Sequence, residues 1–263
     1  MPMCARTCVG QGATRSAHPL SAAPVLSRLG GVQTLGNAPL LLHDALTAWQ
    51  WRPPTSIHQL AEWLEEPAHA DEANALVPIE VGPTYMDCER INVPFGAYVH
   101  ALCGEHDASS DVSSSSSSVR TYLAQSSVFE RAPLLAERMG IEMPCNDVRP
   151  VWWLGPGGTL SPLHRDPTHN VLVQLCGTKK VTLLPADAPK ERLYLAQPPQ
   201  GNTSLVDPYA ADVAERWPSF PKELCTTLTL SPGDALYLPR GTWHQVEAAR
   251  TTPSFSIALW WGA

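Results

Sequence analysis

The chain has 263 residues, of which 44% are hydrophobic and 16% charged, a composition typical of one folded domain with a buried core. It contains no run of about 18 apolar residues, so no membrane-spanning helix is predicted. The net charge of −7 argues against direct nucleic-acid binding, which requires a basic surface, and favours a basic peptide as partner.

The seven cysteines are scattered without a CxxC pair, as is typical of reduced thiols. We therefore expect the protein in the nucleus or the cytoplasm. Residues 1–23 contain arginine and serine but no acidic residue, and we interpret them as a flexible tail before a domain over residues 24–263. Because such a segment also resembles a transit peptide, import into an organelle stays open.

The first half of the domain mixes short strands and helices. Ser56 and Gln59 form a capping signature, and apolar residues then recur at helical spacing up to Pro67, which predicts a helix. A second short helix is expected over 134–139. Residues 107–119 include six consecutive serines and are predicted to form a mobile loop. Short strands are predicted at 39–42 and 77–81, and ordered structure is expected to resume at 122–125.

The second half is rich in short apolar segments separated by proline and glycine, without long helices between them. This pattern predicts a mainly β fold, an antiparallel barrel or jelly roll. Residues 197–221 are rich in proline and are interpreted as a long insertion, of a length that is often functional. The predicted strands span residues 151–155, 170–176, 180–184, 226–230, 235–238 and 254–261.

One constellation carries chemistry. His164 and Asp166 are two residues apart in an extended segment, so both side chains are expected on one face of a strand. His244 follows a predicted strand and a Pro-Arg-Gly turn, which places it near the mouth of the barrel. A His-x-Asp pair or a single histidine is weak on its own. Together, two histidines and one carboxylate match the facial triad of non-haem Fe(II) oxygenases.

Three motifs in order, WLGPGGTLSPLHRDP…N…VQLCGTKK, SPGDALYLPRGTWHQV and SFSIALWW, resemble the JmjC (cupin-like) Fe(II)/2-oxoglutarate oxygenases. Within them the chain looks most like the jumonji-domain-containing protein five group, and VPIEVG and YLAQ extend the match upstream. Members of that group are described as peptidyl-arginine hydroxylases and as lysine demethylases. The resemblance implies a double-stranded β-helix (a cupin-like jelly roll), with flanking helices in the N-terminal half.

The resemblance makes His164, Asp166 and His244 the catalytic iron ligands. It assigns the binding of the far carboxylate of 2-oxoglutarate to Tyr122, Ser161, Asn170 and Lys179. An ammonium, two hydroxyls and an amide are suitable donors to a carboxylate. Without the resemblance, Lys179 would read as a solvated turn residue like Lys180. Trp153 and Trp243 are candidates for the cavity wall.

Glu80, in VPIEVG, resembles a carboxylate that faces the substrate in the arginyl hydroxylases and that could hold a guanidinium through two hydrogen bonds. An exposed glutamate at a strand end is the alternative. The family also shows a tryptophan ten residues later, where this chain has Arg90. His169 has no assigned role and is interpreted as a loop residue.

The leading hypothesis is therefore an oxygenase that uses Fe(II), 2-oxoglutarate and O2 to hydroxylate a protein side chain, arginine, with release of succinate and CO2. The first alternative is demethylation of N-methyl-lysine in histones. A transfer-RNA-modifying oxygenase fits the acidic charge poorly. From another class, the chain could be a cupin-like binding module without catalysis.

Overall fold

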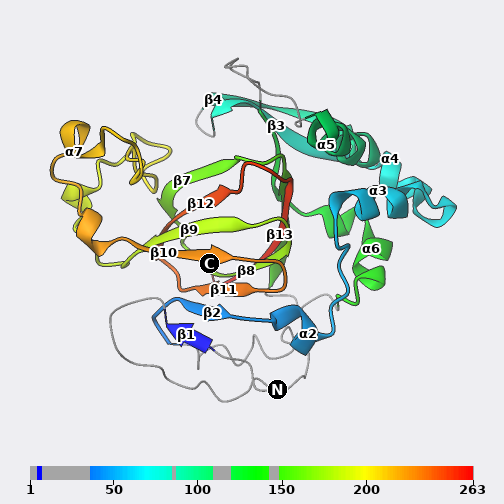
Figure 1. Ribbon diagram of the computed structural model, residues 1–263, viewed down its shortest axis with the longest axis horizontal. Coiled ribbons are helices and arrows are strands. Elements are labelled where there is room, and N and C mark those ends of the chain that lie inside the picture. Colours follow the sequence, from blue (N-terminus) through cyan, green and yellow to red (C-terminus); the bar gives the residue numbers. More distant parts are fainter. Residues whose placement is uncertain (1–4, 8–35, 85–86, 109–119, 142–147, 263) are drawn as a thin grey trace.

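The computed structural model describes residues 5–7, 36–84, 87–108, 120–141 and 148–262 of the chain. Two antiparallel sheets form a jelly roll (Figure 1). The larger sheet has the strand order β1-β2-β11-β8-β13-β6-β5-β3-β4, and the smaller has the order β10-β9-β12-β7. The strands are β1 (Ala5–Thr7), β2 (Leu40–Leu42), β3 (Leu76–Thr84), β4 (Asp87–Pro94), β5 (Arg120–Ser126), β6 (Arg149–Gly155), β7 (Leu160–Arg165), β8 (His169–Cys176), β9 (Lys179–Leu184), β10 (Thr226–Leu230), β11 (Ala235–Leu238), β12 (Trp243–Ala248) and β13 (Ser254–Trp261).

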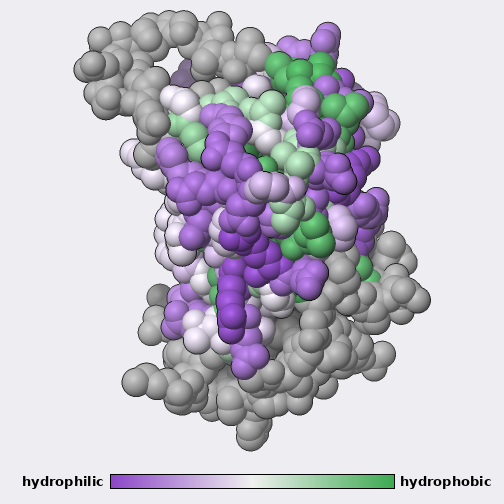
Figure 2. All heavy atoms as spheres, turned by 90° about the vertical axis from the view of Figure 1, so that its right-hand side faces the viewer, coloured by the Kyte–Doolittle hydropathy of each residue, from purple (hydrophilic) through white to green (hydrophobic). Residues whose placement is uncertain are grey.

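Helices from the first half cover one side of the larger sheet (Figure 1). Their outward surface is largely hydrophilic, with scattered apolar patches (Figure 2). Among the described residues no helix has the length and apolar character needed to cross a membrane. The α-helices are α2 (Ala45–Trp49), α3 (Ile57–Glu65), α4 (Ala70–Asn74), α5 (Phe95–Ala108), α6 (Pro133–Arg138) and α7 (Val213–Arg216), and the 3-10 turns are η2 (Pro67–His69), η3 (Val128–Glu130), η4 (Lys190–Arg192) and η5 (Lys222–Leu224).

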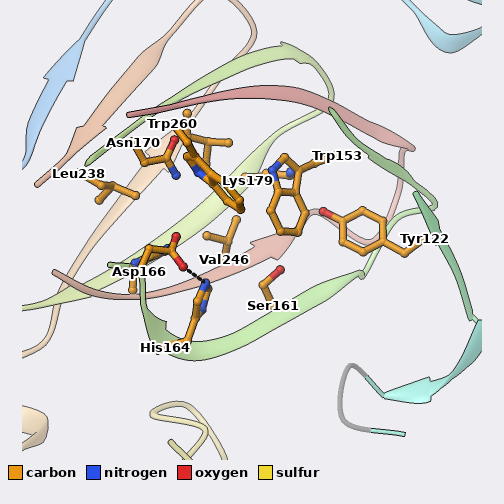
Figure 3. Close-up of a pocket in the computed structure, with 12 residues that line it drawn as sticks. Tyr122, Trp153, Ser161, His164, Asp166, Asn170, Lys179, Leu238, Val246 and Trp260 are labelled. Atoms are coloured by element: carbon orange, nitrogen blue, oxygen red, sulfur yellow. Dashed lines mark ion pairs between the residues drawn. The ribbon is translucent and has the colours of Figure 1, made fainter. Parts of the chain in front are cut away.

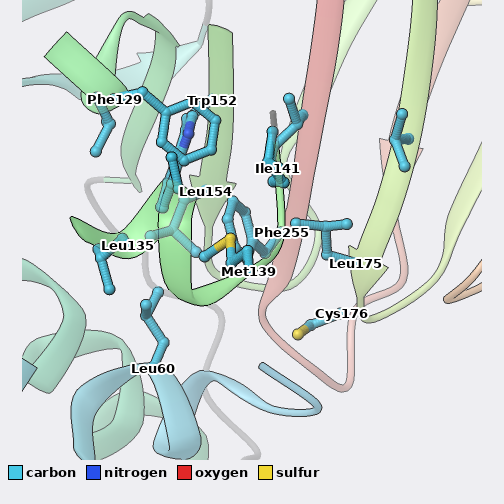
Figure 4. Packing of buried hydrophobic residues seen from close by; sticks show 14 of the residues in the cluster. Leu60, Phe129, Leu135, Met139, Ile141, Trp152, Leu154, Leu175, Cys176 and Phe255 are labelled. Atoms are coloured by element: carbon cyan, nitrogen blue, oxygen red, sulfur yellow. The ribbon is translucent and has the colours of Figure 1, made fainter. Parts of the chain in front are cut away.

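Two consecutive tryptophans on β6 divide the interior, because neighbouring residues of a strand face opposite sides of a sheet. Trp152 faces the helices and packs within 5.7 Å of Phe95, Phe129 and Phe255, measured between ring centroids. This core joins the large sheet to α3 and α6 (Figure 4). Trp153 faces the smaller sheet and belongs to the core between the two sheets. The jelly roll and the helical layer are thus built on opposite faces of one strand.

The connection between β9 and β10, residues 185–225, has a small core of its own against the outer face of the smaller sheet, including Leu163 and Trp243. It also pairs with the outer edge of β7: the Ser204 amide donates to the Leu163 carbonyl at 2.7 Å, and the Arg165 amide to that of Asn202 at 3.0 Å. The predicted Pro-rich insertion is therefore packed against the strand that carries His164.

Most of the predicted elements are present. The Ser56 hydroxyl accepts a hydrogen bond from the Gln59 amide at 3.1 Å and begins α3, as the capping signature predicts. The sequence did not predict strands β1, β4, β5 and β12 or helices α2, α4, α5 and α7. β4 is exposed at most positions, so its sequence carries no apolar alternation, and only its pairing with β3 defines it. Helix α5 holds Gly96 and Gly104, which weaken a helical pattern.

Three local predictions differ from the structure. Ala5–Thr7, inside the predicted flexible tail, pairs with β2, while the rest of residues 1–23 lies outside the described residues. His169 is not a loop residue: it begins β8, and its Nδ1 lies 3.0 Å from the Tyr237 hydroxyl. Trp243 does not line the cavity, because its side chain is on the outer face of β12. Of the Ser-rich segment, residues 109–119 lie outside the described part, and 107–108 end α5.

Replacing Trp152 by alanine should lower the free energy of unfolding by about 3–5 kcal/mol, because it removes a fully buried indole from three aromatic neighbours. Urea denaturation would measure this. Ile91→Ala is the matched control: its side chain on β4 is 46% exposed, so a change within about 0.5 kcal/mol is expected. Equal effects of the two substitutions would contradict the assignment of Trp152 to the shared core.

Candidate metal and cosubstrate site

The pairing of β7 with β12 places His164 directly opposite His244. Their ring centroids are 4.2 Å apart. Asp166 lies one residue beyond the end of β7, and its carbonyl accepts a hydrogen bond from the Gly241 amide at 2.9 Å, which ties it to the turn before β12. Its carboxylate oxygens lie 4.0 Å from His164 Nε2 and 3.8 Å from His244 Nε2.

Each histidine is oriented for metal binding by its other nitrogen. His164 Nδ1 lies 2.7 Å from the Pro162 carbonyl, and His244 Nδ1 lies 3.0 Å from the Thr242 carbonyl. A carbonyl only accepts, so each Nδ1 carries the proton and each Nε2 presents a lone pair beside Asp166. Burial, and then the nearby His244, hold the pKa of His164 below its usual value, which favours the neutral form that binds metals. One ligand atom from each residue lies within 4.8 Å of the others, so the three could hold one metal ion.

The triad faces a cavity between the two sheets (Figure 3). All four cosubstrate residues predicted from the sequence line it, as do Trp153 and four residues that were not predicted. The complete lining is Tyr122, Trp153, Ser161, His164, Asp166, Asn170, Leu172, Lys179, Leu238, His244, Val246 and Trp260. Trp260 could have been predicted from the alternation along SFSIALWW. It shares a strand face with Ala258, which lies in the core between the two sheets.

Lys179 gives the cavity a buried positive end. Its residue is 2% exposed, no described residue accepts a hydrogen bond from its ammonium, and burial lowers its pKa to about 7. Lys179 lies four residues before Leu183, which pairs with His244, so it is about 13 Å from the triad along β9.

Other polar groups in the cavity also lack partners. The buried indole nitrogens of Trp153 and Trp260 and the side-chain oxygen of Asn170 have no hydrogen-bond partner among the described residues. Burial raises the pKa of Tyr122, so its hydroxyl stays protonated and can donate. A buried ammonium with several donors around it fits an anionic ligand, because an unpaired buried charge is strongly unfavourable.

Glu80 lies outside the lining of this cavity but next to it. It pairs in register with Tyr122 on β5, and its residue is 8% exposed. Its carboxylate already has a partner: Arg90 Nη2 donates to Glu80 Oε1 at 2.8 Å. Arg90, which stands where the resembled family shows a tryptophan, thus binds Glu80, the carboxylate that the resemblance assigns to the substrate.

Fold and site together define a cupin-like jelly roll with a two-histidine, one-carboxylate triad at the mouth of its cavity. The chain belongs to the family described as the cupin-like domain, whose model matches residues 33–263.

Known proteins with similar sequences include a Jumonji C domain-containing protein and lysine-specific demethylases. The chain is 34% identical over 205 residues to Jumonji C domain-containing protein 5 of Drosophila melanogaster, covering 72% of this chain and 47% of that protein. It is 32% identical to lysine-specific demethylase 8 of Danio rerio, over 70% of this chain and 45% of that protein. It is 30% identical to lysine-specific demethylase JMJ30 of Arabidopsis thaliana, over 86% of this chain and 50% of that protein. The JmjC resemblance is thereby confirmed, and the chain spans about half the length of these relatives.

The space for Tyr122 in the cavity wall depends on Gly155. A Cβ at Gly155 would lie 2.5 Å from Cδ2 of the Tyr122 ring, which packs against Trp153 with 5.8 Å between centroids. Gly155→Ala should therefore displace Tyr122, weaken binding of 2-oxoglutarate severalfold and reduce stability by about 1–3 kcal/mol. Calorimetric titration with 2-oxoglutarate would show this.

Gly201→Ala is the control for Gly155→Ala, because nothing lies within 4 Å of a Cβ placed there. Unchanged cosubstrate affinity in Gly155→Ala would mean that Tyr122 does not contact 2-oxoglutarate.

Proposed function

We propose that this chain is an Fe(II)- and 2-oxoglutarate-dependent oxygenase that hydroxylates a protein side chain, arginine, with release of succinate and CO2. The observation that carries the proposal is one cavity with two unlike ends. At one end two Nε2 lone pairs and a carboxylate converge within 4.8 Å, and at the other Lys179 is buried without an anion. Both features are explained together by a metal ion and a dicarboxylate.

The contacts of each residue support the role that we assign to it. His164, Asp166 and His244 would hold Fe(II), which with 2-oxoglutarate and O2 supplies the oxidising chemistry. Lys179 would bind the far carboxylate, with Tyr122, Ser161 and Asn170 as further donors. The indoles of Trp153 and Trp260 exclude water from the cavity and offer their N–H groups.

Arginine is proposed as the substrate side chain because of Glu80. This buried carboxylate lies beside the cavity and is shown to bind one guanidinium, that of Arg90. A carboxylate and a guanidinium are matched in charge and in hydrogen-bond geometry. The net charge of −7 also favours a basic peptide.

Demethylation of N-methyl-lysine is the second candidate, and the names of two relatives, both lysine-specific demethylases, favour it. It would use the same triad and cosubstrate residues, and differs in the carbon that is hydroxylated. The two are separated by product mass: a hydroxylated arginine gains one oxygen, whereas a demethylated lysine loses a methyl group. A binding module without catalysis would bind metal without producing succinate.

Anaerobic reconstitution with Fe(II) and 2-oxoglutarate, followed by air, should give succinate that increases with an arginine-containing peptide pool. Asp166→Ala should reduce it to background, because the charged ligand of the metal is lost. Asp187→Ala, on the surface of the insertion, is the control and should retain activity. Full iron-dependent succinate formation by Asp166→Ala would show that the ligand assignment is wrong.

Binding of 2-oxoglutarate should weaken above about pH 7. Since Lys179 has a pKa of about 7 in the free protein, it is charged below that pH and neutral above it, and the dicarboxylate binds the charged form. Above pH 7 each complex must take up a proton, so Kd should rise up to about tenfold per pH unit. Calorimetric titrations between pH 6 and 9, without oxygen, would measure this.

Lys179→Met should lose both the affinity for 2-oxoglutarate and its pH dependence. The neighbouring Lys180→Met should keep both, because Lys180 lies on the other face of β9, over the ring of Tyr209. If the affinity of Lys179→Met matched that of the native protein, the far carboxylate would have to bind elsewhere.

A further inference from the structure

Arg90, Glu80 and Tyr122 form a row across three neighbouring strands. Arg90 on β4 pairs in register with Glu80 on β3, and Glu80 pairs in register with Tyr122 on β5. Side chains that are directly opposite in antiparallel strands share one face of the sheet. Tyr122 lines the cavity that holds the triad. The row therefore leads from the surface at Arg90 to the cavity wall.

The two charges of the pair have very different environments. The side chain of Glu80 is 10% exposed, whereas that of Arg90 is 63% exposed. Arg90 Nη2 donates to Glu80 Oε1, and no described residue donates a hydrogen bond to Oε2. A carboxylate can accept several hydrogen bonds, so Glu80 keeps capacity for a second donor. A buried carboxylate favours a cationic partner, and an ion pair with an exposed cation contributes little to stability.

The wall beyond Glu80 is aromatic. The rings of Tyr122 and Trp153 are 5.8 Å apart, and those of Trp153 and Trp260 are 6.3 Å apart, measured between centroids. Aromatic faces of this kind bind a guanidinium by stacking and by the attraction between a cation and a π system. A guanidinium that enters from the cavity side would thus find rings and the buried carboxylate together.

We propose that Arg90 occupies the position that the guanidinium of a substrate arginine takes in the complex. The substrate arginine binds Glu80 by replacing Arg90 there, so Arg90 determines the affinity and selectivity of the site. This rests on the proposed function, since it takes arginine as the substrate side chain. The apparent affinity is reduced by the fraction of molecules in which Arg90 occupies Glu80. A substrate must offer a guanidinium at least as well placed as that of Arg90.

The opposite arrangement, in which Arg90 recognises an acidic substrate group, is disfavoured by the same geometry. An acid that drew Arg90 away would leave the Glu80 carboxylate buried and unpaired, which is strongly unfavourable. An acid that bound Arg90 in place would face the Glu80 charge within the same pair. A lysine could neutralise Glu80, but its ammonium lacks the planar fork of a guanidinium.

Equilibrium binding of acetyl-Gly-Arg-Gly-amide tests the proposal, measured by calorimetry on the Fe(II) protein with 2-oxoglutarate and without oxygen. Arg90→Gln should tighten binding about twofold to fivefold, the range that an exposed ion pair corresponds to. Glu80→Gln should weaken it at least about tenfold, because a charged hydrogen bond is lost. In the Glu80→Gln background, Arg90→Gln should have no further effect.

A matched control is Arg192→Gln. Arg192 makes an ion pair with Glu223 at 3.0 Å, in the insertion, with both side chains exposed, and its loss should leave peptide binding unchanged. The lysine peptide acetyl-Gly-Lys-Gly-amide should gain less from Arg90→Gln than the arginine peptide does. Binding of the arginine peptide that is detected only in the Arg90→Gln variant would also support the proposal.

Three outcomes would overturn it: weaker or unchanged arginine-peptide binding in Arg90→Gln, an effect of Arg90→Gln that persists without Glu80, or no binding by any variant. These measurements need no turnover. Failure of the proposed function is detected separately, as the absence of an oxygen gain on arginine in air. Arginine hydroxylation with no response to Arg90→Gln would therefore refute this inference alone.

Discussion

The site depends on the antiparallel register between β7 and β12. His164 and His244 are 80 positions apart in the chain, and only this register puts them opposite one another. A shift of one residue would turn one imidazole to the other face of the sheet and remove the triad. The backbone carbonyls of Pro162 and Thr242, each two residues before its histidine, then fix which nitrogen faces Asp166. Strand pairing and ligand orientation are thus parts of one arrangement.

The second constraint is the buried charge of Lys179. A lysine that is 2% exposed and has no anionic partner lowers stability, and here burial shifts its pKa to about 7. The cost is offset only when an anion enters the cavity. The same charge that lowers stability therefore favours the binding of an anion. Stability and anion binding are linked through one side chain.

The sequence predicts the strands of the jelly roll well, because their apolar segments are separated by proline and glycine, and the spacing of His164 and Asp166 indicates the metal site. It does not decide which of Lys179 and Lys180 is buried, because neighbouring strand residues differ only through register.

The Glu80–Arg90 pair was missed for a related reason. β4 has no apolar alternation, so the hairpin that brings these residues together is defined by its pairing with β3. Trp243 was misassigned because a tryptophan beside a ligand can face either side of its strand.

The contact of residues 202–204 with β7 gives the insertion a structural role at the triad. Without it, β7 would be an open edge of the smaller sheet, with unpaired backbone groups beside His164. Because residues 202–204 already occupy the edge of β7, a peptide cannot pair with that edge as an added strand. A single cleavage of the chain in the insertion would release that cover and expose the backbone of β7 beside His164.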